Sequence, residues 1–121
     1  MATLATVGDF VTEARVLLQD TRVPFRYADA ELIMALNIGL REARRLRADL
    51  FLDNLDFTLP DLVTTGAGVM AQAVPMEDFY RPAFIYFMVG RAQLRDQEDT
   101  TDQRAGALIQ KFTGQMLTIA S

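Results

Sequence analysis

The sequence predicts an all-α fold, a four-helix bundle with a long loop or a short β-hairpin between its second and third helices. Three stretches, at about 6–20, 28–47 and 101–117, repeat apolar residues at three- and four-residue spacing. A fourth, at about 81–97, is apolar nearly all round, so neighbours must cover it on more than one face. Its core run is far shorter than the roughly 20 apolar residues of a membrane-spanning helix. The chain has 121 residues, of which 50% are hydrophobic, and fits a single domain over residues 1–121.

The first helix is expected to begin at Thr6, with Asp9 three residues later completing a short form of the capping box. It ends near Asp20, because Pro24 prevents a straight continuation. Its apolar stripe consists of Val7, Phe10, Val11, Ala14, Leu17 and Leu18.

The second helix has Asp29 and Glu31 in its first turn, where the positive end of the helix favours carboxylates. Gly39 lies beside its apolar stripe and indicates a close contact with another helix. Arginines crowd the other end, where cations complement the negative end of the helix. They could also bind nucleic acid, or carboxylates on a neighbouring subunit. The arginines of this region are Arg41, Arg44, Arg45 and Arg47.

Residues 48–76 have no sustained helical period, and TTGAG at 64–68 is expected to be a turn. The segment is too apolar for disorder, so either it folds over the helices or it projects and binds a partner. We favour a projecting loop at about 51–75, because the other helices already cover the third one. Its candidate residues for contacting the tail or a neighbouring subunit are Phe51, Leu55, Phe57, Leu59, Leu62, Val63 and Val69.

The third helix starts near Pro82, and the fourth follows a capping box formed by Thr100 and Gln103. Arg91 lies among apolar neighbours and either extends to the surface or pairs with a carboxylate at an interface. The last residues stay apolar, which indicates docking on this bundle or on another protein. We expect a docking tail at about 115–121, whose deletion leaves the bundle folded. Its predicted docking residues are Phe112, Met116, Leu117 and Ile119.

The amino-acid composition excludes several classes of function. The net charge is −4, which argues against a sequence-specific DNA-binding protein. There is no cysteine and no histidine, which excludes disulfides, thiolate nucleophiles and Cys- or His-based metal sites. The carboxylates follow no known catalytic or metal-binding spacing, so we expect neither an enzyme nor a cofactor. The N-terminus has no secretion signal, and no membrane segment is expected.

Surplus apolar surface and a strong arginine bias indicate subunit interfaces. Mean hydropathy is +0.11, and Lys111 is the single lysine. Arginine suits bidentate carboxylate pairs at interfaces. A well-filled core and a codon bias explain the same observations equally well.

Two stretches resemble the head-to-tail adaptor (connector) proteins of tailed bacteriophages. In the first stretch, one helix ends with the pattern R-x-L-L-x-D and the next helix starts with D-A-E-L. That second helix continues with L-N-x-G and ends in an arginine-rich segment. The second, FYRPAFIYFMVGRAQLRDQED through RAGALIQKF, is similar to the later helices of that family, with Arg91, Ala92 and Asp96 in matching places. The residues of the first pattern are Arg15, Leu17, Leu18, Asp20, Asp29, Ala30, Glu31, Leu32, Leu36, Asn37 and Gly39.

The resemblance implies a structural virion protein at the head–tail junction, assembled in the host cytoplasm. Such proteins form a homo-oligomeric ring, usually of about twelve copies, beneath the portal protein. The ring connects the portal to a tail or nozzle protein and continues the DNA channel. DNA passes through it without sequence-specific binding, which suits an acidic chain. Arg41, Arg44, Arg45 and Arg91 are the candidates for salt bridges between subunits.

Two other functions stay open. A small helical DNA-binding protein, either a regulator or a terminase small subunit, would need a basic recognition helix. Only the arginines of residues 41–47 offer one, and the net acidity argues against it. An enzyme with paired carboxylates would need a deep pocket with raised carboxylate pKa values.

Overall fold

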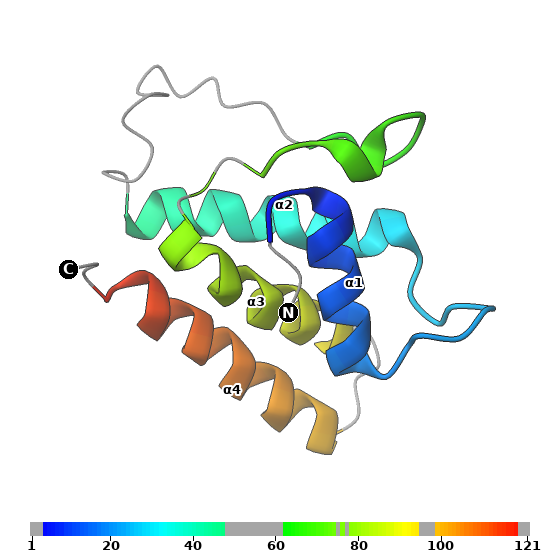
Figure 1. The fold of residues 1–121 in the computed structure, drawn as a ribbon. Helices are drawn as coiled ribbons and strands as arrows, with labels where there is room; N and C mark the ends of the chain where they lie inside the picture. Colours follow the sequence, from blue (N-terminus) through cyan, green and yellow to red (C-terminus); the bar gives the residue numbers. More distant parts are fainter. Residues whose placement is uncertain (1–3, 48–61, 75, 77, 95–98, 119–121) are drawn as a thin grey trace.

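The computed structural model describes residues 4–47, 62–74, 76, 78–94 and 99–118 (Figure 1). They contain four α-helices: α1 (Val7–Leu18), α2 (Asp29–Leu46), α3 (Arg81–Leu94) and α4 (Asp99–Met116). Two 3-10 turns, η2 (Val69–Ala71) and η3 (Asp78–Tyr80), lie between α2 and α3. The described ranges contain no β-strand, so the all-α prediction is confirmed.

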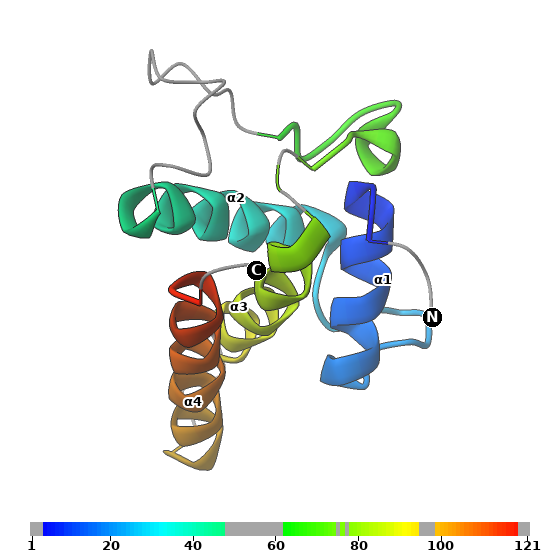
Figure 2. The same ribbon diagram turned by 60° about the vertical axis from the view of Figure 1, so that its left-hand side comes forward.

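α3 is the central helix. It packs against each of the other three, and it lies between α2 and α4 with α1 across it (Figures 1 and 2). Phe84 and Met88 are fully buried, as the apolar character of this stretch predicts. The ring of Phe112 from α4 lies against two α3 rings, at centroid distances of 5.3 Å from Phe84 and 4.8 Å from Phe87. Aromatic pairs at such distances add to the stabilisation from burial alone.

The start of α1 has the predicted capping box. The backbone N–H groups of Ala5 and Thr6 each donate to Asp9 Oδ2 at 3.1 Å, and the Asp9 N–H donates to Thr6 Oγ1. These bonds from the Thr6 and Ala5 backbone lower the pKa of Asp9. The end of α1 is a left-handed residue, Gln19, with φ of 56°. The chain therefore turns away five residues before Pro24.

Residues 62–74 lie along α1 and α2, which corrects the expected projection of this part of the loop. Thr6 and Ala73 form an isolated antiparallel bridge, and the Val7 N–H donates to the carbonyl of Gln72 at 2.9 Å. Val69 and Val74 are buried in the core. The remainder of the expected loop lies outside the described residues.

Two side-chain amides form the hydrogen bonds to the backbone of this segment that a neighbouring β-strand would otherwise form. The amide of Asn37 on α2 bonds both backbone groups of Leu62, at 2.8 Å and 3.0 Å. The amide of Gln72 bonds both backbone groups of Val63, each at 2.8 Å. Between Val63 and Gln72, the predicted TTGAG turn contains Gly66 and Gly68, which adopt positive φ angles. The extended chain is thus satisfied without a β-ladder.

Two glycines set the spacing of the helices around α3. A Cβ added to Gly39 would lie 3.0 Å from a ring carbon of Phe87, which confirms the predicted close contact. A Cβ added to Gly90 would lie 2.9 Å from Ile109 Cγ1 and 3.0 Å from the backbone carbonyl oxygen of Ala105. An added methyl group is harder to accommodate at Gly90 than at Gly39, because the backbone carbonyl of Ala105 cannot rotate away as a side chain can.

We therefore expect Gly90→Ala to destabilise the protein by about 2 kcal/mol, since α3 and α4 must separate to admit the methyl group. The matched control is Gly106→Ala on α4, where an added Cβ meets no atom within 4 Å. That control should stabilise the helix by about 0.5–1 kcal/mol. Urea denaturation followed by circular dichroism measures both. Equal effects of the two substitutions would contradict the tight α3–α4 contact.

Candidate interaction surfaces

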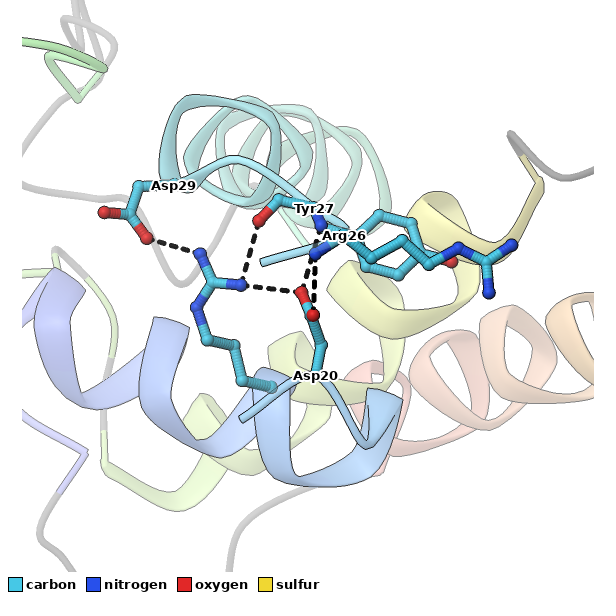
Figure 3. A network of polar contacts seen from close by, with 5 residues as sticks. Asp20, Arg26, Tyr27 and Asp29 are labelled. Carbon is cyan, nitrogen blue, oxygen red and sulfur yellow. Dashed lines mark hydrogen bonds and ion pairs between the residues drawn. The ribbon is translucent and has the colours of Figure 1, made fainter. Parts of the chain in front are cut away.

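A buried ion network fixes the connection between α1 and α2 (Figure 3). Arg15 Nη1 donates to Asp20 Oδ2 and to the Tyr27 carbonyl, both at 2.8 Å, and Arg15 Nη2 donates to Asp29 Oδ1 at 2.5 Å. Asp20 in turn accepts from the backbone N–H groups of Arg26 at 2.7 Å and Tyr27 at 3.0 Å. One arginine therefore joins the end of α1 to the start of α2.

The environment of Asp20 keeps it ionised. Burial by itself raises the pKa of this carboxyl, but the backbone N–H groups of Arg26 and Tyr27 and the charge of Arg15 outweigh burial. The pKa of Asp20 is consequently lowered from its usual value. The side chains of Arg15 and Asp20 are each only 7% exposed, whereas that of Asp29 is half exposed.

Residues 21–26, which we call the arm, extend from this network and are all exposed. Val23 is 81% exposed and Phe25 43% exposed. The guanidinium of Arg15 lies 3.9 Å from the centre of the Phe25 ring, a cation–π contact that orients the ring. Val16, on the adjoining turns of α1, is 54% exposed. The arm is therefore an apolar projection with a fixed base.

A second apolar surface lies at the other end of the molecule, where α4 ends and α3 begins (Figure 1). Phe79 is 55% exposed and Leu117 is 54% exposed. Here a hollow of about 230 Å³ is lined by Phe79, Pro82, Gln115 and Thr118. We call the hollow that these four residues line the tail hollow.

The chain behind the tail hollow is held by a polar clamp. Arg47 Nη1 donates to the carbonyl of Met116 at 2.9 Å, and the hydroxyl of Tyr80 donates to the carbonyl of Thr118 at 2.8 Å. Arg47 Nη1 also donates to the Tyr80 hydroxyl at 3.3 Å. These donors satisfy carbonyls that the end of a helix leaves without intrahelical partners.

The predicted docking tail needs correction. Phe112 and Met116 are fully buried, because they pack into the core rather than facing a partner. Leu117 has an exposed side chain, and Ile119 lies outside the described residues. The end of α4 thus packs on the rest of its own chain as far as Thr118.

The candidate loop residues have different locations. Val63 is 57% exposed, Leu62 is half-buried and Val69 is 7% exposed in the core. Val69 is therefore not part of a free surface. Phe51, Leu55, Phe57 and Leu59 lie outside the described residues.

The four arginines proposed for subunit contacts are spread over α2 and α3. Arg41, Arg45 and Arg91 are exposed, and Arg44 is half-buried. Arg45 forms an ion pair with Glu42 on its own helix, and this pair raises the pKa of Arg45. Arg91 lines a shallow hollow between α2 and α3 together with Glu31 and the half-exposed Met34.

Sequence reasoning missed the arm and Phe79 as candidate contact residues. The sequence does carry a signal for the arm, because TRVPFRY places apolar residues in a connection between helices. The neighbouring Val16 also falls outside the apolar stripe of α1. The stripe residue Leu17, by contrast, is 37% exposed.

Most residues of the R-x-L-L-x-D, D-A-E-L and L-N-x-G pattern have structural explanations. Arg15, Asp20 and Asp29 meet in one network, Asn37 holds Leu62, and Leu32, Leu36 and Gly39 pack in the core. The pattern therefore specifies how α1, α2 and the 62–74 segment fit together.

Comparisons with protein-family models, with curated proteins and with solved structures give no match for this chain. Among the described residues, no three acidic side chains gather in a way that could hold a metal ion. No helix in the described ranges combines the length and the apolar character needed to cross a membrane.

Proposed function

We propose that this chain is a head-to-tail adaptor of a tailed bacteriophage, a four-helix bundle that assembles into a ring of about twelve copies. The ring would lie beneath the portal protein at the head–tail junction of the virion. It would meet a tail or nozzle protein on its other side and enclose the DNA channel. The sequence resemblance motivates this proposal.

One structural observation carries the ring assembly. The arm and the tail hollow are two different apolar surfaces on opposite ends of one subunit (Figure 1). A symmetric dimer needs only one self-complementary surface, whereas a ring needs two different surfaces that meet head to tail. The chain has two such surfaces, and this favours a ring over an isolated monomer.

The charge of the chain favours a channel protein over a DNA-binding regulator. The net charge is −4, and the arginines near the end of α2 include Arg45, which is paired with Glu42. Duplex binding draws much of its free energy from neutralising phosphates. An acidic ring lets DNA slide through without strong attachment.

The proposal is tested by light scattering and negative-stain electron microscopy of the purified full chain over a range of concentrations. We expect rings with a central hole at high concentration. Particles that stay monomeric or form only symmetric dimers would contradict the proposal. A parallel duplex-binding assay at low and moderate salt tests the alternative, because tight, salt-sensitive binding would favour a regulator.

A further inference from the structure

We propose that a groove beside α1 binds an extended segment of a partner protein, one that carries an arginine or lysine between apolar residues. The groove consists of two adjoining hollows, of about 510 Å³ and 560 Å³, and Asp29 and Met70 line both of them. It lies between α1, the arm, the start of α2 and η2, which packs beside α1 (Figures 1 and 2). We call it the acidic groove. The inference goes beyond the proposed function, because it does not require a ring.

The first hollow suits the stem of a long side chain. Val16, which is 54% exposed, and Phe25, which is 43% exposed, both line it. Its volume lies within the range of about 300–1,000 Å³ that is typical of ligand pockets. The aliphatic part of an arginine or lysine buries well against such a surface, while its charged end reaches polar groups.

Two carboxylate oxygens in this hollow are open to a cation. Asp29 Oδ1 accepts from Arg15 at 2.5 Å, whereas Asp29 Oδ2 points away from the network (Figure 3). Asp9 Oδ2 accepts from the backbone N–H groups of Ala5 and Thr6, and no described residue donates to Asp9 Oδ1. Those backbone bonds lower the pKa of Asp9, so it is ionised at neutral pH. A guanidinium or ammonium group would supply the missing donors.

The surrounding charges also favour a cation. Among the described residues, Arg15 is the one arginine that lines the groove, and the carboxylates of its own network already match its charge. Asp9 therefore leaves the groove with surplus negative charge. Arg22 and Arg26 on the arm line neither hollow, and Arg26 extends away from Asp29 (Figure 3). The phosphates of a nucleic acid would be repelled here.

The second hollow offers backbone groups to an extended chain. It is lined by the TTGAG turn, in which the exposed Thr65 forms no hydrogen bond with another described residue. A Cβ added to Gly66 or Gly68 would meet no atom within 4 Å, so a second backbone can approach this turn closely. Backbone hydrogen bonds combined with a side-chain pocket are a recurring mode of peptide recognition. The two hollows together therefore favour a peptide over a small cation.

Two capped, dye-labelled peptides test the inference. Their sequences are SVTRVTS and SVTEVTS, so that they differ only in the central residue. Fluorescence anisotropy with the full chain should show at least about tenfold tighter binding of the arginine peptide, because the glutamate would lie against Asp9 and Asp29. Equal affinities, or no binding of the arginine peptide at about 1 mM protein, would overturn the inference.

Two variants locate the site, each with a matched control. Val16→Arg places a competing cation at an exposed position in the groove and should weaken binding of the arginine peptide at least about tenfold. Its control is Met34→Arg, at a residue that is 51% exposed and lines neither hollow. Asp29→Asn should weaken binding about fivefold, since its carboxylate is half exposed and partly screened. Its control, Glu31→Gln, also lies outside both hollows. Equal effects of a variant and its control would overturn the inference.

Other occupants of the groove give different results. If free arginine displaces the labelled peptide at the same concentration as the unlabelled arginine peptide, a small cation is the ligand and the inference is wrong. If neither peptide binds and Val16→Arg abolishes self-association, another copy of the chain occupies the groove, which also overturns the inference. Ring formation is measured separately by electron microscopy, so a failure of peptide binding is distinguishable from a failure of the adaptor proposal.

Discussion

Met116→Ala is expected to lower the free energy of unfolding by about 3 kcal/mol, although this residue lies near the end of the chain. Met116 is fully buried and belongs to the same core as Phe112 and Phe84. Truncating a buried methionine to alanine removes apolar contacts and leaves a cavity, which typically costs about 2–5 kcal/mol. A loss of this size is a large share of the stability of a small domain. Thermal and urea unfolding followed by circular dichroism measure it.

The matched control is Leu117→Ala, one residue further along. Leu117 is 54% exposed, so its truncation should change the stability by less than about 0.5 kcal/mol. Deletion of residues 115–121 should be at least as harmful as Met116→Ala, because it also removes the Thr118 carbonyl that Tyr80 binds. Similar unfolding midpoints for Met116→Ala and Leu117→Ala would refute the buried position of the α4 end.

This expectation reverses the one drawn from sequence, and the reason is physical. An apolar terminus indicates that something covers it, but a one-dimensional pattern does not say whether the cover is the same chain or another. In the structure, Arg47 and Tyr80 bind the backbone at the end of α4, and both residues are distant from Met116 in the sequence. Contacts of this kind have no local signal.

The helices were predictable because their determinants are local. The capping box of Thr6 and Asp9, the acidic first turn of α2 and the all-round apolar character of α3 can be read within a few residues. The course of residues 62–74 was not predictable in the same way. It depends on the amide of Asn37 bonding Leu62, a contact across 25 positions whose partner no periodicity reveals.

The candidate surfaces show the same limit. The sequence predicted contact residues both in the loop between the second and third helices and at the apolar end of the last helix, and Val63 of the loop is indeed exposed. It could not separate exposed from buried positions near the end of α4, because Met116 and Leu117 are adjacent and equally apolar. The arm was overlooked because its projection depends on the network around Arg15 rather than on its own composition.

Asp20→Asn is expected to destabilise the protein by about 3 kcal/mol at pH 7, because it leaves the buried guanidinium of Arg15 without its least exposed counter-charge. The matched control is Asp29→Asn, which makes the same chemical change at the half-exposed end of the network. Solvent screens that ion pair, so the control should cost only about 1 kcal/mol. Urea unfolding of the three proteins measures the difference. A smaller loss from Asp20→Asn than from Asp29→Asn would contradict the central place of Asp20.

The pH dependence gives this prediction a second, independent readout. The pKa of Asp20 is lowered in the folded state, so its stabilising contribution is fully present above the unfolded pKa of about 3.9. The contribution is lost as the pH falls through the lower folded pKa, where Asp20 becomes protonated and resembles asparagine. The stability curves of the natural protein and Asp20→Asn should therefore lie apart near neutral pH and converge below about pH 4. The same substitution should also loosen the arm, because its base is held by the backbone N–H groups of Arg26 and Tyr27 on this carboxylate. A variant that keeps the full separation at low pH would show that the loss comes from packing and not from the charge of Asp20.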